Sequence, residues 1–215
     1  MRTVRLLPAL IGLLVLALSA PACGAEPEDV PTATGGSPSS SSSPSVTSAR
    51  TSVSARSDGM PTKAEWLDDV AAAMHGSRAY LGRRVARGGG KLAIVLDIDN
   101  TSIASYYAWP KPVRPVRRFA GKAHRLGVTI FIVTGRRASH LGRAPRALTR
   151  AGYHYKSICT RRDGETLRHG KLRCRKRIQR HGYTIVANVG NRSTDFWHGH
   201  FERKYKLPDY GNRLA

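Results

Sequence analysis

Two carboxylates placed directly after a run of apolar residues constrain the fold of this chain more than any other feature. The stretch from Lys91 to Ser102 reads Lys-Leu-Ala-Ile-Val-Leu-Asp-Ile-Asp-Asn-Thr-Ser. Its apolar residues at 92–96 predict a strand buried on both faces, which is typical of a parallel α/β sheet. Asp97 and Asp99 would lie at the carboxyl end of that strand, where open α/β sheets bind ligands. Because each acid must be hydrated, paired or metal-bound, this pair is the leading candidate for a functional site.

The chain from residue 59 onward alternates between predicted helices and strands. A capping box, Thr62-x-x-Glu65, begins a helix whose apolar spacing continues to Leu81. Further helices are expected from about residue 115, at 138–151 and around 171–181, and a glycine ends each one. Strands are expected at 128–136, 155–160 and 184–189, and prolines predict a loop at 105–112. This alternation predicts an α/β fold with a parallel sheet flanked by helices.

Four short motifs follow one another along these elements. Asp97-x-Asp99-x-Thr101 comes first, and the strand at 128–136 ends in Thr134-Gly135-Arg136. Lys171 lies in a basic helix, and the last predicted strand is followed by Gly190-Asn191-Arg192-Ser-Thr-Asp195. Over residues 63–215 this order resembles the motifs of the haloacid dehalogenase (HAD) superfamily. Within it the chain looks most similar to the class B, subfamily IIIB acid phosphatases of exported bacterial proteins, judged by the Asp97 motif, the Lys171/Arg175/Gly182-Tyr183 spacing and the lack of room for a large cap.

The resemblance implies a HAD-type Rossmann-like parallel sheet with a minimal cap or none, and a phosphomonoester hydrolase that acts through an aspartyl-phosphate. Asp97 would be the nucleophile, and Asp99 would protonate the leaving group and then activate water. Phosphate would be held by Thr134, Gly135 and Lys171. Two carboxylates and a phosphate repel one another, so a hard cation such as Mg²⁺ is expected. Its ligands would be Asp97, Asp99 through its backbone carbonyl, Asn191 and Asp195.

Asn191 departs from the commonest form of the last motif, which has an acid at this position. Lipin-like phosphatidate phosphatases, which are also HAD proteins, similarly have Gly-Asn-Arg before their final Asp. Three functions therefore stay open: hydrolysis of a phosphorylated small molecule, hydrolysis of a lipid- or wall-linked phosphate, and a HAD-fold binding protein with impaired catalysis.

The chain is strongly basic. Its formal net charge is +22, and residues 136–180 alone contain 15 Lys or Arg and 2 Asp or Glu. Two explanations of this charge stay open. It is either a solvated, arginine-rich surface or a surface that attracts phosphorylated substrates, anionic wall polymers or membranes. No helix-turn-helix, zinc-finger or RNP-like pattern occurs, so nucleic acid is not an expected partner.

The N-terminal part predicts export. Residues 1–22 have a basic start, an apolar core and a small-residue cleavage site, as in a signal peptide. Residues 23–58 are rich in Ser, Thr and Pro and predict a disordered tether. The HAD-like phosphatase domain would then span residues 59–215. Cys23 is a candidate lipid-carrying residue that would tether the protein to a membrane, and the alternatives of lipoprotein and freely secreted protein stay open.

The other two cysteines, Cys159 and Cys174, form an even pair in an oxidising compartment, so a disulfide or two buried thiols are the alternatives. Their spacing does not indicate a metal site. His198 and His200 are interpreted as surface residues, and the closing segment from Lys206 is expected to pack back on the domain. The sequence does not indicate an oligomeric state.

Overall fold

The computed structural model describes residues 59–214. The predicted signal peptide at 1–22 and the predicted tether at 23–58, with Cys23, lie outside the described residues. The helices are α1 (Lys63–Ala73), α2 (Ser77–Ala86), α3 (Ser105–Ala108), α4 (Arg114–Arg125), α5 (Ala144–Arg150) and α6 (Leu167–Arg180), with short 3-10 helices η1 (Ala138–His140) and η2 (Ser193–Asp195). The strands are β1 (Lys91–Leu96), β2 (Thr129–Arg137), β3 (Ser157–Arg161), β4 (Tyr183–Gly190) and β5 (Lys204–Lys206).

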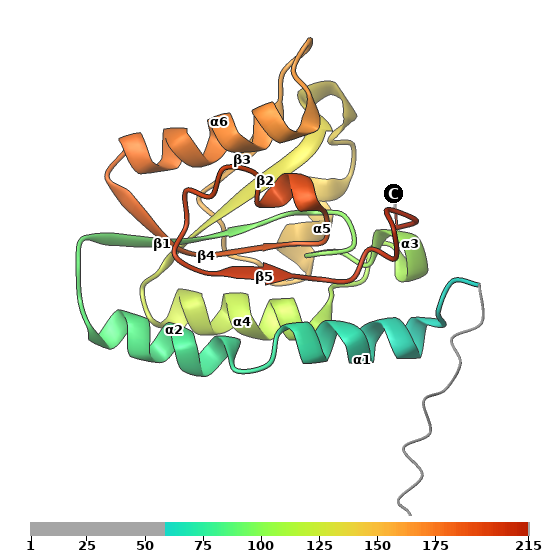
Figure 1. Cartoon of the computed structure of the whole chain (residues 1–215), viewed down its shortest axis with the longest axis horizontal. Helices are drawn as coiled ribbons and strands as arrows, with labels where there is room; N and C mark the ends of the chain where they lie inside the picture. The colour runs from blue at the N-terminus through green and yellow to red at the C-terminus, as the bar shows by residue number, and fades with distance from the viewer. Residues whose placement is uncertain (1–58, 215) are drawn as a thin grey trace, which may run out of the picture. The chain divides into compact units, whose positions relative to one another are not determined.

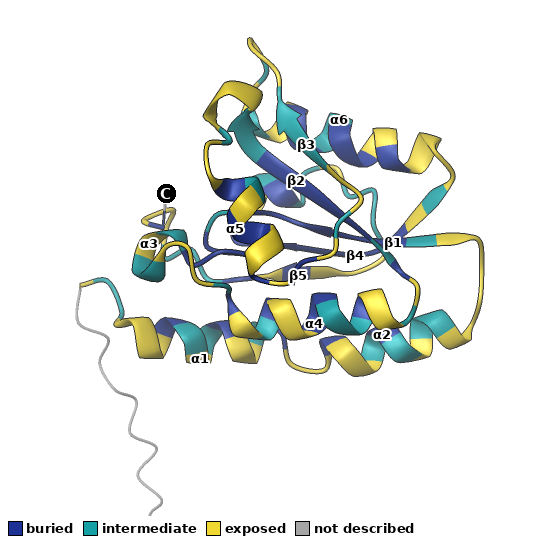
Figure 2. Cartoon of the chain, turned by 180° about the vertical axis from the view of Figure 1, so that it is seen from behind, coloured by how far each residue is buried: buried dark blue, intermediate teal, exposed yellow. Residues whose placement is uncertain are grey.

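The strands form one parallel sheet in the order β3-β2-β1-β4-β5. Helices α1, α2 and α4 cover one face of it and α6 covers the other (Figures 1 and 2). The central strand alternates between the two layers: Ile94 and Leu96 belong to the core under α4, and Ala93 and Val95 belong to the core under α6. The prediction of a strand buried on both faces in a parallel α/β sheet is confirmed.

Two predicted helices are divided in the structure, and both divisions occur at a glycine. The capping box is formed, with Thr62 N donating to Glu65 Oε2 at 2.7 Å. The helix does not continue to Leu81, because Gly76 has a φ of +68° between α1 and α2. The predicted helix at 138–151 is instead η1 followed by α5, and Gly142 between them has a φ of +51°. A left-handed residue of this kind interrupts the helical hydrogen bonds.

Other differences concern short elements. The predicted loop at 105–112 begins with the single helical turn of α3, and β5 was not predicted. The expected packing of the C-terminal segment is confirmed, since Leu207 and Leu214 are buried and Asn100 Nδ2 donates to Leu214 O at 3.1 Å. Between β1 and β2 the chain forms only α3 and α4, so there is no cap domain at this position, as predicted.

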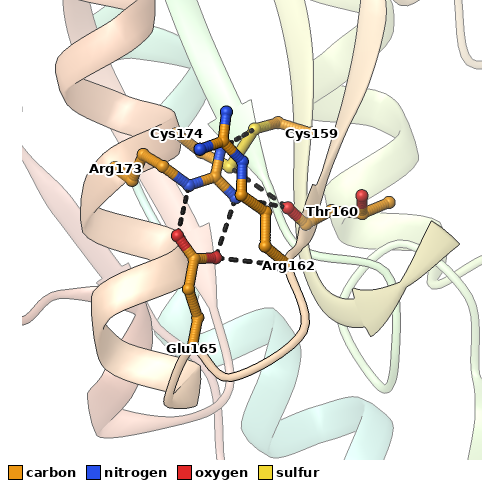
Figure 3. The surroundings of a disulfide bond; sticks show 6 residues. All are labelled: Cys159, Thr160, Arg162, Glu165, Arg173 and Cys174. Atoms are coloured by element: carbon orange, nitrogen blue, oxygen red, sulfur yellow. Dashed lines mark hydrogen bonds and ion pairs between the residues drawn. A yellow bond between two sulfur atoms is a disulfide. The ribbon is translucent and has the colours of Figure 1, made fainter.

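A disulfide joins Cys159 in β3 to Cys174 in α6, with the sulfur atoms 2.06 Å apart (Figure 3). The structure therefore favours a bridge over two free thiols. Beside it, Arg173 Nε donates to Glu165 Oε1 at 2.5 Å, and Arg162 N donates to Glu165 Oε2 at 2.8 Å. These contacts fix α6 and the loop before it to the edge strand of the sheet. Within residues 59–214, no helix has the length and apolar character needed to cross a membrane.

Candidate active site

A tight turn after β1 brings both acids to the carboxyl end of the sheet. The backbone N–H groups of Ser102 and Ile103 donate to Ile98 O at 3.0 and 2.9 Å, and Ser102 Oγ donates to Asp97 O at 2.6 Å. Asp97 itself is hydrogen-bonded to the neighbouring strand through its N–H, which donates to Val189 O at 3.0 Å. Its carboxylate is therefore placed by the rigid centre of the sheet.

Lys171 joins the carboxylates of two different motifs. Its Nζ donates to Asp97 Oδ1 at 3.1 Å and also contacts Asp195 Oδ1 directly. All three side chains are at least nine-tenths buried. Burial and the nearby Asp195 and Asp99 raise the pKa of Asp97 above its ordinary value, against the opposing effect of Lys171. Burial lowers the pKa of Lys171, but its two carboxylate partners outweigh that effect and raise it, so the lysine stays charged.

Close packing leaves no free space beside two glycines of the site. A Cβ on Gly190 would lie 2.3 Å from Asp195 Cγ, and one on Gly135 would lie 2.6 Å from Leu167 Cδ2 and 3.7 Å from Lys171 Cε. Neither position has room for a side chain without moving the neighbouring group. The predicted phosphate-binding Gly135 is thus adjacent to Lys171, and Gly190 allows Asp195 to fold back on the end of β4.

Asp99 is held by a residue that sequence reasoning did not assign to the site. Arg136, at the end of β2, donates from Nε to Asp99 Oδ2 at 2.7 Å and from Nη2 to Oδ1 at 2.6 Å, and Ser105 Oγ donates to Oδ1 at 2.6 Å. Burial raises the pKa of Asp99, but these hydrogen bonds outweigh it and hold the pKa below its ordinary value. Thr134, the predicted phosphate ligand, is buried and its Oγ1 accepts from Arg136 N at 3.2 Å.

A fully buried arginine supports the loop that carries Asp195. Arg175 donates to Asp195 O at 2.7 Å and Gly199 O at 2.8 Å, and also to Trp197 O. Asn188 Nδ2 donates to the same Asp195 carbonyl at 2.7 Å. Burial lowers the pKa of Arg175 to about 10, which leaves it protonated at neutral pH. Because these donors are satisfied by backbone oxygens, we interpret Arg175 as a residue that positions Asp195.

The oxygen-rich donor set fits Mg²⁺, which prefers carboxylates and amide or backbone carbonyl oxygens. Asp97 and Asp195 are close enough to share one ammonium group. Asn191 is buried, and its side-chain nitrogen has no hydrogen-bond partner among the described residues, so the amide is not committed to another protein group. Within residues 59–214, no group of three or more His, Cys, Asp and Glu side chains is arranged around one point. A cation here would need the amide or a backbone carbonyl in addition to two carboxylates.

The structure thus brings Asp97, Lys171 and Asp195 into direct contact. Asp99 is held next to this group by Arg136, and Asn191 lies directly after β4.

Arg136 could have been found from the sequence, because it directly follows Thr134-Gly135 at the end of the same strand. Arg175 could have been found as the residue four positions after Lys171 on one helical face. The histidine interpretation agrees with the structure: His198 is exposed, and His200 Nδ1 lies 2.6 Å from Gln179 Oε1.

The fold and this constellation of acids around one lysine define a HAD-type phosphatase. The sequence profile of the family described as HAD superfamily, subfamily IIIB (acid phosphatase) matches residues 104–213, and the chain belongs to this family. It is a phosphoric monoester hydrolase of that superfamily. The match begins just after the turn that carries Asp97 and Asp99.

Solved structures of low sequence identity share the fold. The class C acid phosphatase from Bacillus anthracis with tungstate bound is 18% identical, with a TM-score of 0.57 over 72% of this chain and 81% of that one. A second structure of the class C acid phosphatase from Bacillus anthracis is 17% identical, with the same TM-score over 72% of this chain and 80% of that one. Among curated proteins, none matches the sequence significantly.

Proposed function

We propose that the protein is a Mg²⁺-dependent phosphomonoesterase that acts on phosphorylated small molecules through an aspartyl-phosphate on Asp97. The observation that carries this proposal is the contact of one buried lysine with the carboxylates of Asp97 and Asp195 at the carboxyl end of the sheet. A nucleophile needs a fixed position and an electropositive neighbour, and this arrangement supplies both.

In the first step, an Asp97 carboxylate oxygen attacks the phosphorus and the bond to the leaving oxygen breaks. Asp99 gives its proton to that oxygen, so an alcohol leaves. In the second step, Asp99 takes a proton from a water molecule whose oxygen attacks the phosphorus. Inorganic phosphate departs, and the Asp97 carboxylate is regenerated.

The remaining residues bind and orient the phosphate. The Thr134 hydroxyl and the Lys171 ammonium group would contact the oxygens of the transferring phosphoryl group, and these contacts would stabilise the charge that builds up during transfer. Arg136 holds Asp99 in the structure, so its contact must be exchanged for one with the substrate before Asp99 can carry a proton.

The cation would be held by Asp97, Asp195, the Asp99 backbone carbonyl and the Asn191 amide oxygen. When bound, Mg²⁺ supplies positive charge that offsets the repulsion between the carboxylates and the phosphate and favours the ionised form of Asp97.

Phosphate release by the purified protein from aryl phosphate and a panel of alkyl phosphomonoesters, with Mg²⁺ and with a chelator, tests the proposal. We expect turnover that is lost with the chelator and restored by added Mg²⁺. Turnover that continues unchanged in the chelator would exclude a required divalent cation, and no turnover of any monoester would exclude the activity.

We further propose that the enzyme works outside the cytoplasm, either secreted or anchored through a lipid on Cys23. The support is the composition of residues 1–58. Metabolic labelling with a radioactive fatty acid, compared between the natural chain and Cys23→Ser, distinguishes these forms. Label on the natural chain alone indicates a lipoprotein.

A further inference from the structure

A groove of about 900 Å³ lies between the loop that follows α3 and helix α5. Its lining contains one exposed aromatic residue and five cations, and no Asp or Glu: Trp109, Lys111, Arg117, Arg143, Arg146 and Arg150. We propose that this arginine groove binds phosphate groups in the leaving part of the substrate. The preferred substrates would then be phosphomonoesters at the end of a short phosphodiester-linked polyanion. This inference rests on the phosphomonoesterase function proposed above.

Two arginines of α5 and the arginine that directly precedes this helix form a row of positive charge without acidic partners among residues 59–214. Arg143, Arg146 and Arg150 are three and four positions apart, which places them on the same side of the helix, and all three are exposed. No ion pair joins any of them to a carboxylate of the described residues, whereas Arg84 and Arg173 pair with Glu202 and Glu165. Like charges at this spacing repel and weaken the helix. An anionic ligand would remove that repulsion.

One lining residue of the groove, Trp109, lies against the arginine that holds Asp99. The Arg136 guanidinium lies 5.8 Å from the centre of the Trp109 ring and also binds Asp99. Figure 2 shows α3, which precedes Trp109, near α5. At the end of α5, Ala151 O accepts a hydrogen bond from Arg117 Nε at 2.7 Å, so the Arg117 guanidinium is fixed in place. A substrate with its terminal phosphate at Asp97 would therefore direct its leaving group past Arg136 and Trp109 into the groove.

The lining favours a polyanion without aromatic units. Single-stranded nucleic acid is bound on several aromatic side chains, on which successive bases stack. This groove offers only Trp109, whose ring already faces Arg136. An oligomer of alkyl phosphodiesters, such as linked glycerol phosphates, needs only the cations.

The test compares glycerol phosphate with a linear trimer of glycerol phosphate that ends in a phosphomonoester. We expect kcat/KM for the trimer to exceed that for the monomer about tenfold at low salt, as two exposed ion contacts would give. In about 0.5 M salt the ratio should fall towards one, because screening weakens exposed contacts. The variant Arg146→Gln/Arg150→Gln should show a ratio near one at low salt. The matched control is Arg177→Gln/Arg180→Gln, which removes two exposed arginines of α6 that do not line the groove and should keep the full ratio.

A ratio near one in the natural protein, or an equal loss in both double variants, would overturn the inference. A 5′-phosphorylated trinucleotide used as well as the glycerol trimer would overturn the choice of a non-aromatic polyanion. If no monoester is hydrolysed, the proposed function fails. The binding role of the groove is then tested separately, by calorimetric titration of the protein with a glycerol phosphate trimer that lacks the terminal phosphomonoester. Binding that the Arg146/Arg150 variant loses and the control retains would support the groove, and no binding would overturn it.

Discussion

Helix α6 supports two regions of the molecule by different means. On its inner face, Lys171 binds Asp97 and Asp195 in an ion-pair group whose side chains are 3–7% exposed. Two residues further on, Arg173 pairs with Glu165, where both side chains are 20% exposed, and Cys174 is bonded covalently to Cys159.

Helix α6 thus carries both a candidate active-site residue and the covalent bond that holds the sheet edge. Removing one partner from a buried ion pair leaves an uncompensated charge and is strongly destabilising, whereas a more exposed pair contributes about 1 kcal/mol or less. The proposed active site would therefore depend on reversible contacts that a phosphate can replace. The sheet edge is held by a covalent bond that no substrate has to displace.

The largest effect is expected for Asp97→Asn. The amide has the same shape but is not nucleophilic, so kcat should fall by about 10³-fold or more, equivalent to about 4 kcal/mol in the barrier. The melting temperature should change little, because Lys171 keeps Asp195 as a partner. Steady-state kinetics and thermal unfolding measure the two effects. The control is Asp163→Asn, the same change at a carboxylate that is 91% exposed. A variant that retains a few per cent of the natural rate would remove Asp97 from the nucleophile role.

Reduction of the disulfide should act on stability and not on catalysis. Cys159 and Cys174 are 15 positions apart, and a loop of this length implies about 3 kcal/mol of stabilisation in the chain-entropy model. Denaturant unfolding with and without reductant measures this difference, and kcat for the folded protein should be unchanged. The double variant Cys159→Ser/Cys174→Ser should not respond to reductant. A large loss of kcat in the folded, reduced protein would show that the two regions of α6 are coupled.

Asp99→Asn should lower the rate by about 10²-fold, and most for leaving groups that need protonation. The change also removes the ionic partner of Arg136, whose guanidinium becomes available to the phosphate, so KM for an anionic substrate should not rise. Rates for alkyl and nitrophenyl phosphates measure the selectivity. Equal losses for both would contradict the role of general acid.

Asn191→Asp adds a negative charge at the predicted cation site. Mg²⁺ should bind about tenfold more tightly, while KM for an anionic substrate rises because the phosphate meets more repulsion. Calorimetric titration with Mg²⁺ and steady-state kinetics measure these changes, and the chemical step should stay within about tenfold. Unchanged Mg²⁺ affinity would place Asn191 outside the metal ligands.

The smallest effect concerns pH at the sheet edge. Hydrogen bonds from Arg173 lower the pKa of Glu165 to about 2 in the folded protein, from about 4.3 in an unfolded chain. A depressed pKa contributes stability that is fully present above the unfolded value and is lost as pH falls through the folded value. The difference in unfolding free energy between the natural chain and Glu165→Gln, at most about 1 kcal/mol, should therefore be constant above about pH 5 and shrink between about pH 4 and 2. A difference that stays constant down to pH 2 would show that this ion pair does not stabilise the fold.

Elements with local signals could be predicted from the amino-acid sequence alone. The apolar run before Asp97 specified the buried central strand, the Thr62–Glu65 pattern specified a helix start, and the short distance from β1 to β2 excluded a large cap. The order of the motifs also predicted that Asp97 and Asp195, each of which follows a strand, lie at one end of the sheet. This works because the carboxyl ends of parallel strands meet at the same edge.

Which charges meet at that end of the sheet depends on the three-dimensional arrangement of the chain. Arg136 contacts Asp99 across 37 positions and Lys171 contacts Asp97 across 74, so both contacts depend on strand order and not on local pattern. The carbonyl contacts of Arg175 and the convergence of Lys111, Arg117 and α5 on one groove are likewise long-range. In a chain with 27 arginines, composition indicates that the surface is basic. It cannot say which arginines are paired, which are buried and which remain available to a ligand, because packing alone fixes their neighbours.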